Sequence, residues 1–266
     1  MHPLLDMQAR PIVGHRGNAA HAPENTIESF RQAVSLGVDA LEFDVHLSAD
    51  GHVLVIHDPT LDRTTTGSGR VERLTLAEIQ RADAGARFTR DRGQSFPYRG
   101  QGITVPTLHE VLRSFPGMPL LIEIKADPAA RPTRELIERL EAAERCIVAS
   151  FHQAAMDAFR GSGIARGASR RDTARLLWRA MLRVPVGRVG FNVMCMPPAH
   201  RGLPLPVGGY AAILEPSGVP VHCWTIDDPR DAERLRRRGV RGIISNDPGP
   251  MIKAGFGVKA SSVRER

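Results

Sequence analysis

Three carboxylates lie on two stretches whose alternation is typical of β-strands. Glu42 and Asp44 alternate with large apolar residues over positions 40–47, and Glu123 does so over positions 120–125. Successive side chains of a strand point to opposite faces, so Glu42 and Asp44 are expected to share one face. For one stretch alone, the same pattern would also fit the solvent-facing side of an amphipathic strand.

Burial of these acids in a barrel would require a compensating charge. Helices cover the outside of a parallel barrel and side chains fill its inside, so neither face of a strand meets water. Three buried carboxylates would repel one another unless a cation lies between them. Oxygen ligands select a hard cation, so we expect Glu42, Asp44 and Glu123 to bind Mg²⁺ or Ca²⁺. The alternative is a buried salt-bridge cluster with Lys125 or Arg16.

Two histidines each close a short apolar run. His15 ends the first run of the chain, and His57 ends the run that follows the acidic stretch. Barrel chemistry takes place at the C-terminal ends of strands, and an imidazole can act as an acid or a base near neutral pH. A single histidine is more often structural, but two at equivalent strand ends favour catalysis. Arg16 and Lys125 would supply positive charge for phosphoryl oxygens.

Apolar runs and helical stretches alternate along the chain. Repeated βα units imply a parallel sheet, and about eight strands favour a closed (β/α)8 TIM barrel over an open sheet. Strands are expected at 11–15, 40–47, 53–56, 120–125, 147–151, 219–226 and 242–245, with further candidates at 164–169 and 189–194. Helices are expected from 26 to 37, and near 75–81, 107–114, 131–144, 170–183 and 228–238.

Two regions fit this alternation poorly. Residues 84–106 are rich in Gly and Arg and are expected to form an inserted loop. Residues 160–210 leave the strand register open. We expect one barrel domain over residues 1–255, followed by a disordered tail over 256–266.

Bulk composition agrees with a single large α/β domain. The chain has 266 residues, 42 % of them hydrophobic, which suffices for a sizeable core. Cys146, Cys195 and Cys223 are odd in number and widely spaced, so we interpret them as reduced core thiols. Neither a signal peptide nor a membrane-spanning run is recognisable, so a soluble cytoplasmic protein is expected.

The net charge of +7 reflects an excess of arginine in the second half of the chain. On a helix, four of these arginines would form one stripe opposite an apolar face. One interpretation is an outer barrel helix with a solvated basic face, and the other is a helix that contacts a membrane surface. No recognised nucleic-acid-binding motif is present, so nucleic acid is not an expected partner. The stripe consists of Arg171, Arg175, Arg179 and Arg183, and the apolar face of Ala174, Leu177, Trp178 and Met181.

An ordered set of short motifs resembles the glycerophosphodiester phosphodiesterase family, a family of metal-dependent TIM barrels. Each tripeptide is weak evidence by itself, but the set spans nearly the whole chain in order. It consists of His15-Arg16-Gly17, Pro23-Glu24-Asn25-Thr26, Glu42-x-Asp44, Asp50-Gly51, His57-Asp58, Glu123-Ile124-Lys125, Trp224-Thr225 and Asn246-Asp247-Pro248. Within these motifs we expect Asn25 to cap a helix, Glu24 to brace His15 or Arg16, and Asp58 to orient a neighbour or cap its loop.

The resemblance implies a role for each candidate residue. It implies hydrolysis of small-molecule glycerophosphodiesters to sn-glycerol 3-phosphate and an alcohol, in which a glycerol hydroxyl attacks the phosphorus and water opens the resulting cyclic phosphate. The metal ligands would be Glu42, Asp44 and Glu123, the acid/base pair His15 and His57, the phosphate-binding residues Arg16 and Lys125, and the aromatic pocket residue Trp224.

The sequence departs from the family pattern at three places: Ser48-Ala49 before the Asp-Gly turn, Ile226-Asp227 after Trp224, and residues 160–210. The last two are expected to alter the pocket rim and the leaving-group side. Two alternatives follow: a lysophospholipase D or sphingomyelinase-D-like enzyme acting on lysolipids, and a non-catalytic barrel that binds anions. No oligomeric state is predicted.

Overall fold

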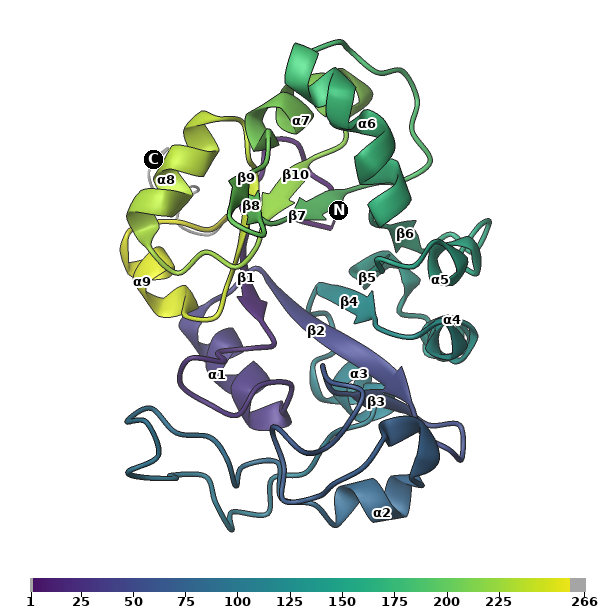
Figure 1. Cartoon of the computed structure of the whole chain (residues 1–266), viewed down its shortest axis with the longest axis vertical. Coiled ribbons are helices and arrows are strands. Elements are labelled where there is room, and N and C mark those ends of the chain that lie inside the picture. Colours follow the sequence, from purple (N-terminus) through teal and green to yellow (C-terminus); the bar gives the residue numbers. More distant parts are fainter. Residues whose placement is uncertain (1, 259–266) are drawn as a thin grey trace.

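Eight parallel strands form a closed barrel in the computed structural model, which describes residues 2–258 (Figure 1). The hydrogen-bonded order is β6-β5-β4-β2-β1-β11-β10-β7, and a parallel bridge between Gly167 and Val193 joins the two ends. The TIM barrel predicted from the sequence is therefore confirmed. The strands are β1 (Ile12–His15), β2 (Ala40–Leu47), β4 (Leu120–Ile124), β5 (Cys146–Ala149), β6 (Ala165–Arg166), β7 (Met194–Met196), β10 (Val221–Cys223) and β11 (Gly242–Ser245).

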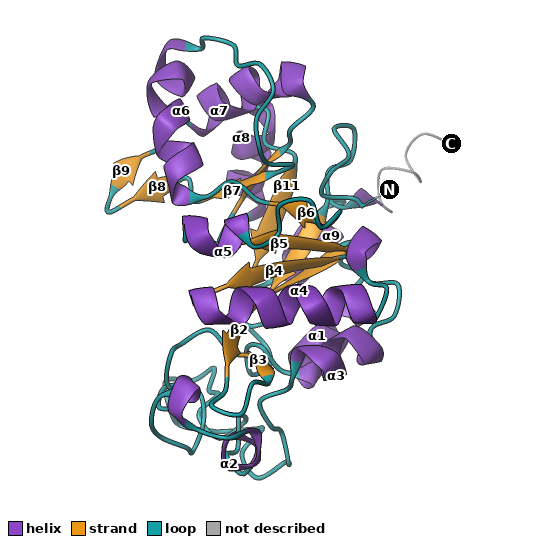
Figure 2. Ribbon diagram, turned by 90° about the vertical axis from the view of Figure 1, so that its right-hand side faces the viewer, coloured by secondary structure: helices purple, strands orange, loops and turns teal. Residues whose placement is uncertain are grey.

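Helices cover the outside of the barrel (Figures 1 and 2). Capping explains where several begin, because the side chains of Thr26, Thr107 and Ser169 each accept a backbone N–H of the first turn. Asn25 was expected to act as a cap, but Thr26 does so instead. The helices are α1 (Ile27–Leu36), α2 (Leu76–Gln80), α3 (Leu108–Ser114), α4 (Ala130–Arg139), α5 (Gln153–Asp157), α6 (Arg170–Leu182), α7 (Val207–Leu214), α8 (Pro229–Arg237) and α9 (Pro248–Lys253).

Side-chain alternation on β2 separates the outer core from the barrel interior. Leu41, Phe43 and Val45 are fully buried in the layer between strands and helices. Glu42 and Asp44 consequently point to the opposite, inner side of the barrel. This alternation confirms the arrangement predicted for the acidic strand.

A short hairpin corrects the predicted origin of His57. Strand β3 (Val53–Val55) pairs antiparallel with β2 and lies outside the barrel path. His57 therefore does not end a barrel strand, contrary to the prediction. The hairpin reverses the chain direction, and the Ile56 N–H donates to the Asp44 carbonyl at 3.0 Å. The hairpin thus places His57 at the level of Asp44, although no barrel strand leads to it.

The two irregular regions have different structures. Residues 84–106 contain no helix or strand, which confirms the inserted loop. In 160–210, β6 lies within the first candidate segment, whereas β7 begins only at Met194, the last residue of the second. A small hairpin follows, made of β8 (Ala199–His200) and β9 (Leu203–Pro204). These strands have only two or three residues, which explains why their register was not evident from sequence.

The predicted end of the domain, residue 255, lies within the described residues. Phe256 is only 8 % exposed, and the Arg236 guanidinium lies 4.2 Å from its ring centroid. Most of the expected disordered tail, residues 259–266, lies outside the described residues. No helix among the described residues is long and apolar enough to cross a membrane.

A buried histidine closes the floor of the barrel. His222 on β10 is fully buried; its Nε2 donates to the Leu4 carbonyl at 2.9 Å, and its Nδ1 accepts the Gly242 N–H at 2.7 Å. The contact with Gly242 needs the neutral ring, because a protonated Nδ1 cannot accept a hydrogen bond. Burial lowers the pKa of His222 from 6.5 to about 4.

We expect stability to fall as the pH drops from 6.5 to about 4, in part because of His222. A histidine with a depressed folded-state pKa stabilises the fold fully above its unfolded pKa and loses that contribution on acidification. The loss should reach about 3 kcal/mol. Urea unfolding across this range measures it, and His222→Gln, which can still donate and accept, should show a shallower pH dependence. Equal slopes in both proteins would contradict the assignment.

Candidate active site

A cavity of about 210 Å³ opens at the C-terminal ends of the barrel strands. It brings together predicted site residues that are up to 209 positions apart in sequence, from His15 to Trp224. Asp44, which is fully buried, lies directly beside it. Of the predicted site residues, the cavity is lined by His15, Arg16, Glu42, His57, Glu123, Lys125 and Trp224.

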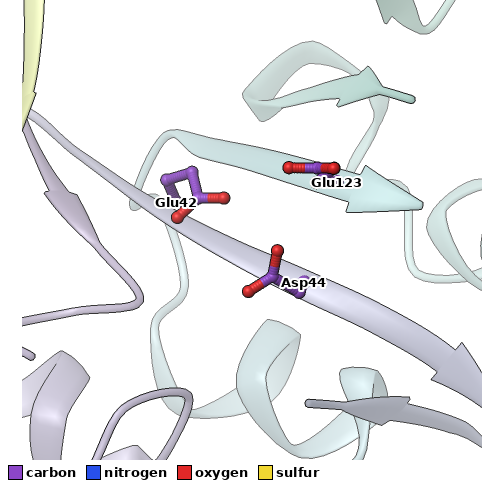
Figure 3. Close-up of side chains that lie close together, drawn as sticks. All are labelled: Glu42, Asp44 and Glu123. Carbon is purple, nitrogen blue, oxygen red and sulfur yellow. The ribbon is translucent and has the colours of Figure 1, made fainter. Parts of the chain in front are cut away.

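The three predicted metal ligands converge in this cavity (Figure 3). One carboxylate oxygen from each of Glu42, Asp44 and Glu123 lies within 4.8 Å of the others. Parallel pairing of β2 with β4 produces this convergence, because the register sets Asp44 beside Glu123. The cluster matches the oxygen-rich ligand set that Mg²⁺ and Ca²⁺ prefer.

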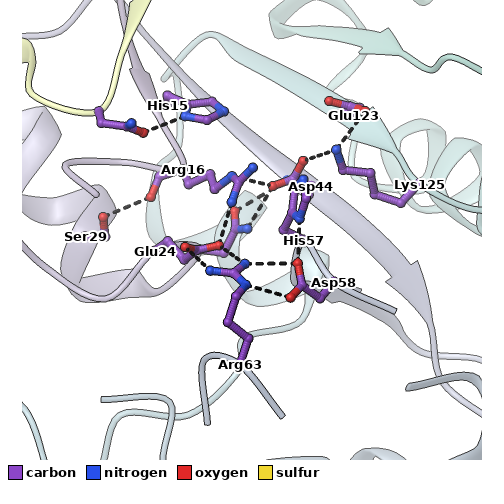
Figure 4. Close-up of polar contacts among 12 residues, drawn as sticks. His15, Arg16, Glu24, Ser29, Asp44, His57, Asp58, Arg63, Glu123 and Lys125 are labelled. Atoms are coloured by element: carbon purple, nitrogen blue, oxygen red, sulfur yellow. Dashed lines mark hydrogen bonds and ion pairs between the residues drawn. The ribbon is translucent and has the colours of Figure 1, made fainter. Parts of the chain in front are cut away.

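Two cations flank the same cluster (Figure 4). The Lys125 Nζ lies 2.9 Å from Asp44 Oδ1 and 2.8 Å from Glu123 Oε1, and the Arg16 Nε lies 3.1 Å from Asp44 Oδ2. The salt-bridge arrangement considered from the sequence is thus present together with the acidic cluster. The two cations contact Asp44 and Glu123, whereas Glu42 accepts the Arg16 backbone N–H at 3.0 Å and lies 3.8 Å from His15 Nε2.

The pKa shifts of the three carboxyl groups differ in direction. Burial raises the pKa of Glu42 well above its ordinary value, and repulsion from Asp44 and Glu123 raises it further. Burial also raises the pKa of Glu123. Burial opposes ionisation of Asp44 as well, but Lys125 and Arg16 bring its pKa below the ordinary value. Three carboxylates therefore exceed the two neighbouring cations, and a bound divalent cation would relieve the repulsion.

A tight turn positions His15 and Arg16 at the end of β1. Gly17 has a φ of 89°, and a Cβ there would lie 2.4 Å from the Ser29 Oγ, so only glycine fits. The His15 Nδ1 lies 2.6 Å from the Asn246 Oδ1, which orients the ring and leaves Nε2 3.8 Å from Glu42. Burial, followed by the Arg16 charge, lowers the pKa of His15.

A chain of charged groups holds His57. Its Nδ1 donates to Asp58 Oδ1 at 2.7 Å, and Arg63 binds both oxygens of Asp58, through Nε at 2.6 Å and through Nη2 at 3.0 Å. Arg63 also contacts Glu24, which in turn binds the Arg16 guanidinium at 2.7 Å (Figure 4). Glu24 therefore braces Arg16, and Asp58 orients His57. Both were among the expected alternatives.

Sequence reasoning missed Arg63, Asn246 and the contact of Asn25 with Asp44. Asn246 and Asn25 lie inside motifs that had been singled out, but the amide of Asn25 donates to Asp44 Oδ2 at 2.9 Å instead of capping a helix. Arg63 lies in a stretch with no recognisable pattern. Only its contacts with two separate segments reveal it.

Replacing Arg63 by Met should lower kcat by roughly 10- to 100-fold, because Asp58 would lose the partner that fixes its position against His57. KM should rise as well, because Arg63 also holds Glu24 against Arg16, the residue expected to bind phosphate. Steady-state kinetics with a glycerophosphodiester measures the effect, and Arg63→Lys should recover part of it. An unchanged kcat would show that Asp58 keeps its position without Arg63.

Comparison with known proteins agrees with this geometry. The model of the glycerophosphoryl diester phosphodiesterase family matches residues 15–160 and 200–250. The chain belongs to this family. The matched ranges contain all eight predicted site residues, whereas residues 161–199, with β6, α6 and β7, are unmatched. The sequence-based prediction of the family, and of an enzyme of the phosphoric diester hydrolase class, is confirmed.

Individual relatives show how far the likeness extends. A glycerophosphodiester phosphodiesterase from Caldanaerobacter subterraneus is 33 % identical over 91 % of this chain and 96 % of its own length. The phosphodiesterase domain of a Mycobacterium tuberculosis protein superposes with a TM-score of 0.83 at 23 % identity, covering 93 % of this chain and 99 % of that one, which shows the fold. An Oleispira antarctica phosphodiesterase, solved in complex with the product sn-glycerol-3-phosphate, has a TM-score of 0.72 at 26 % identity over 92 % and 96 % of the two chains.

Proposed function

We propose that this protein hydrolyses glycerophosphodiesters to sn-glycerol 3-phosphate and an alcohol, with a divalent cation and histidine acid/base catalysis. The observation that carries the proposal is the convergence of three carboxylates and two histidines in one cavity. The family match supports it, as does the related phosphodiesterase whose structure holds sn-glycerol-3-phosphate.

Glu42, Asp44 and Glu123 would hold the cation, Mg²⁺ or Ca²⁺. When bound, such a cation polarises phosphoryl oxygens and stabilises charge that develops in the transition state. The donor set fits, because the cluster offers only carboxylate oxygens and carries more negative charge than Lys125 and Arg16 neutralise. Zinc, which prefers nitrogen and sulfur ligands, fits less well.

The two histidines are proposed as the acid/base pair. In each ring Nδ1 is engaged, by Asn246 for His15 and by Asp58 for His57, so Nε2 remains to accept or donate a proton. One histidine would take the proton of the attacking glycerol hydroxyl, and the other would protonate the departing alkoxide. In the second step water opens the cyclic phosphate with these roles reversed. Arg16 and Lys125 would contact the phosphoryl oxygens.

Aromatic side chains would receive the alcohol portion. The rings of Phe151 and Trp224 lie 6.3 Å apart in an edge-to-face arrangement, and both line the cavity. Phe151 is 45 % exposed, so it stands at the mouth. This apolar rim is the observation that supports the alternative activity on lysolipids, since an acyl chain could leave the cavity across it.

A coupled assay for glycerol 3-phosphate across several glycerophosphodiesters, with and without chelator, tests the proposal. Turnover that stops with chelator and returns with Mg²⁺ or Ca²⁺ is the expected result. Comparing glycerophosphocholine with lysophosphatidylcholine separates the two enzyme functions: faster release of choline from the lysolipid would favour the lysophospholipase D activity. Ligand binding without turnover, insensitive to chelator, would instead support the non-catalytic barrel.

A further inference from the structure

Helix α6 exposes an unusual set of side chains on the side that faces away from α7. Trp178, Met181 and Leu182 are 52 %, 67 % and 70 % exposed, whereas Ala180 on the packed side is 2 % exposed. Seven large hydrophobic residues among those described are exposed, and four of them, these three and Leu177, belong to this one helix. The apolar residues predicted to lie opposite the arginines are therefore also exposed to solvent. We call the outward set Arg171, Ala174, Arg175, Trp178, Met181 and Leu182 the α6 outer face.

The arginines of this face differ from those on other outer helices. On α4, Arg131 and Arg134 each pair with a glutamate four residues later, and on α8 Arg237 pairs with a glutamate four residues earlier. Among the described residues, no ion pair involves Arg171 or Arg175. The single acid of α6 is Asp172, whose carboxylate is occupied by the capping box with Ser169. The positive charge of the α6 outer face is therefore not locally compensated.

This face begins at the mouth of the cavity. Gly167 and Ala168, just before α6, line the cavity, and the Arg170 guanidinium lies 5.9 Å from the centroid of the Phe151 ring at the rim. Helix α6 also lies in the stretch 161–199 that the family model leaves unmatched. The surface thus extends outward from the site where substrate would enter.

We propose that the α6 outer face docks on an anionic lipid bilayer. A tryptophan and aliphatic side chains beside unpaired arginines suit the interface, where apolar groups enter the head-group boundary and arginines meet lipid phosphates. Each arginine near an anionic surface adds to the attraction. A second copy of this chain is a poorer occupant, because a two-fold contact would bring the same arginines against each other. Docking would present the cavity mouth to the membrane.

Vesicle flotation tests the proposal on the full chain, with equimolar phosphatidylcholine and phosphatidylglycerol against phosphatidylcholine alone. The wild type should bind the anionic vesicles. Arg171→Glu/Arg175→Glu and Trp178→Ser/Met181→Ser should each weaken this binding at least about tenfold. The matched control Arg31→Glu/Arg131→Glu makes the same net charge change on α1 and α4 and should bind like the wild type. Turnover of soluble glycerophosphocholine should be unchanged in all of them, which separates docking from catalysis.

Three outcomes would overturn the proposal. The first is absence of wild-type binding to anionic vesicles. The second is an equal loss of binding in the control, which would indicate attraction through overall charge. The third is a dimer in sedimentation velocity that Trp178→Ser/Met181→Ser dissociates, since the face would then join two copies of the chain.

Discussion

Replacing His57 or His15 by alanine is expected to abolish turnover of glycerophosphodiesters while the fold persists. Each variant removes one member of the proposed acid/base pair, and a positioned acid or base contributes roughly 10²- to 10⁴-fold in rate. The two rings reach the cavity from different segments, the end of β1 and the hairpin after β3, so neither can substitute for the other. Alanine also leaves no buried unpaired charge at either position.

Initial rates in the coupled glycerol 3-phosphate assay measure this effect, and thermal unfolding reports the fold. His109→Ala is the matched control, because His109 is an exposed histidine on α3, away from the cavity. It should retain wild-type rates. Full activity in the His15 or the His57 variant would remove that residue from the proposed pair.

Replacing Glu42 by glutamine is expected to lower cation-dependent turnover by at least about 100-fold without destabilising the cation-free protein. The cation contributes several kcal/mol to transition-state stabilisation, and each 1.4 kcal/mol corresponds to a factor of ten in rate. Burial and the charges of Asp44 and Glu123 disfavour ionised Glu42, so a neutral amide of the same shape removes a repulsion. The melting temperature without cation should therefore stay the same or rise.

Thermal unfolding with increasing Mg²⁺ or Ca²⁺ provides the second measurement. A ligand that binds only the folded state raises its stability by about 2.7 kcal/mol at a concentration of 100 times Kd. This increase should be present in the wild type and in the control Glu144→Gln, an exposed glutamate far from the cluster in sequence, and it should be lost in Glu42→Gln. Undiminished stabilisation of Glu42→Gln by the cation would exclude Glu42 as a ligand.

The elements with strong local signals were predicted closely from the sequence. Strand β2 has the bounds expected for it, because its alternation of apolar and acidic residues matches two chemically different faces. Helix α6 also agrees with its expected range, since Ser169 caps its start. Helices α5, α7 and α9 were not expected. Helices α5 and α9 have only five and six residues, and α7 contains no polar side chain other than Tyr210, so none of the three shows an amphipathic period of 3.6 residues.

The prediction that His57 lies in the cavity was correct, but the predicted element that positions it was wrong. Its apolar run was predicted to be a barrel strand, but that run pairs antiparallel with β2 outside the barrel. A three-residue apolar run looks the same in sequence whether it pairs parallel or antiparallel, because its pattern does not identify the partner strand. Arg63 shows the opposite case, in which no local pattern exists: Asp58 is only five positions away, but the contact with Glu24, 39 positions away, depends on the tertiary structure.

The sequence by itself determined the barrel class, the family and the chemical types available at the strand ends. These properties depend on local periodicity and on the order of short motifs along the chain, and both can be recognised in the sequence. Only the tertiary structure decided that Lys125 and Arg16 share Asp44, whereas no lysine or arginine side chain among the described residues pairs with Glu42. It also decided that the apolar residues of α6 face solvent. Charge compensation and burial depend on which distant segments of the chain come into contact. The spacing of residues along the sequence does not specify these contacts.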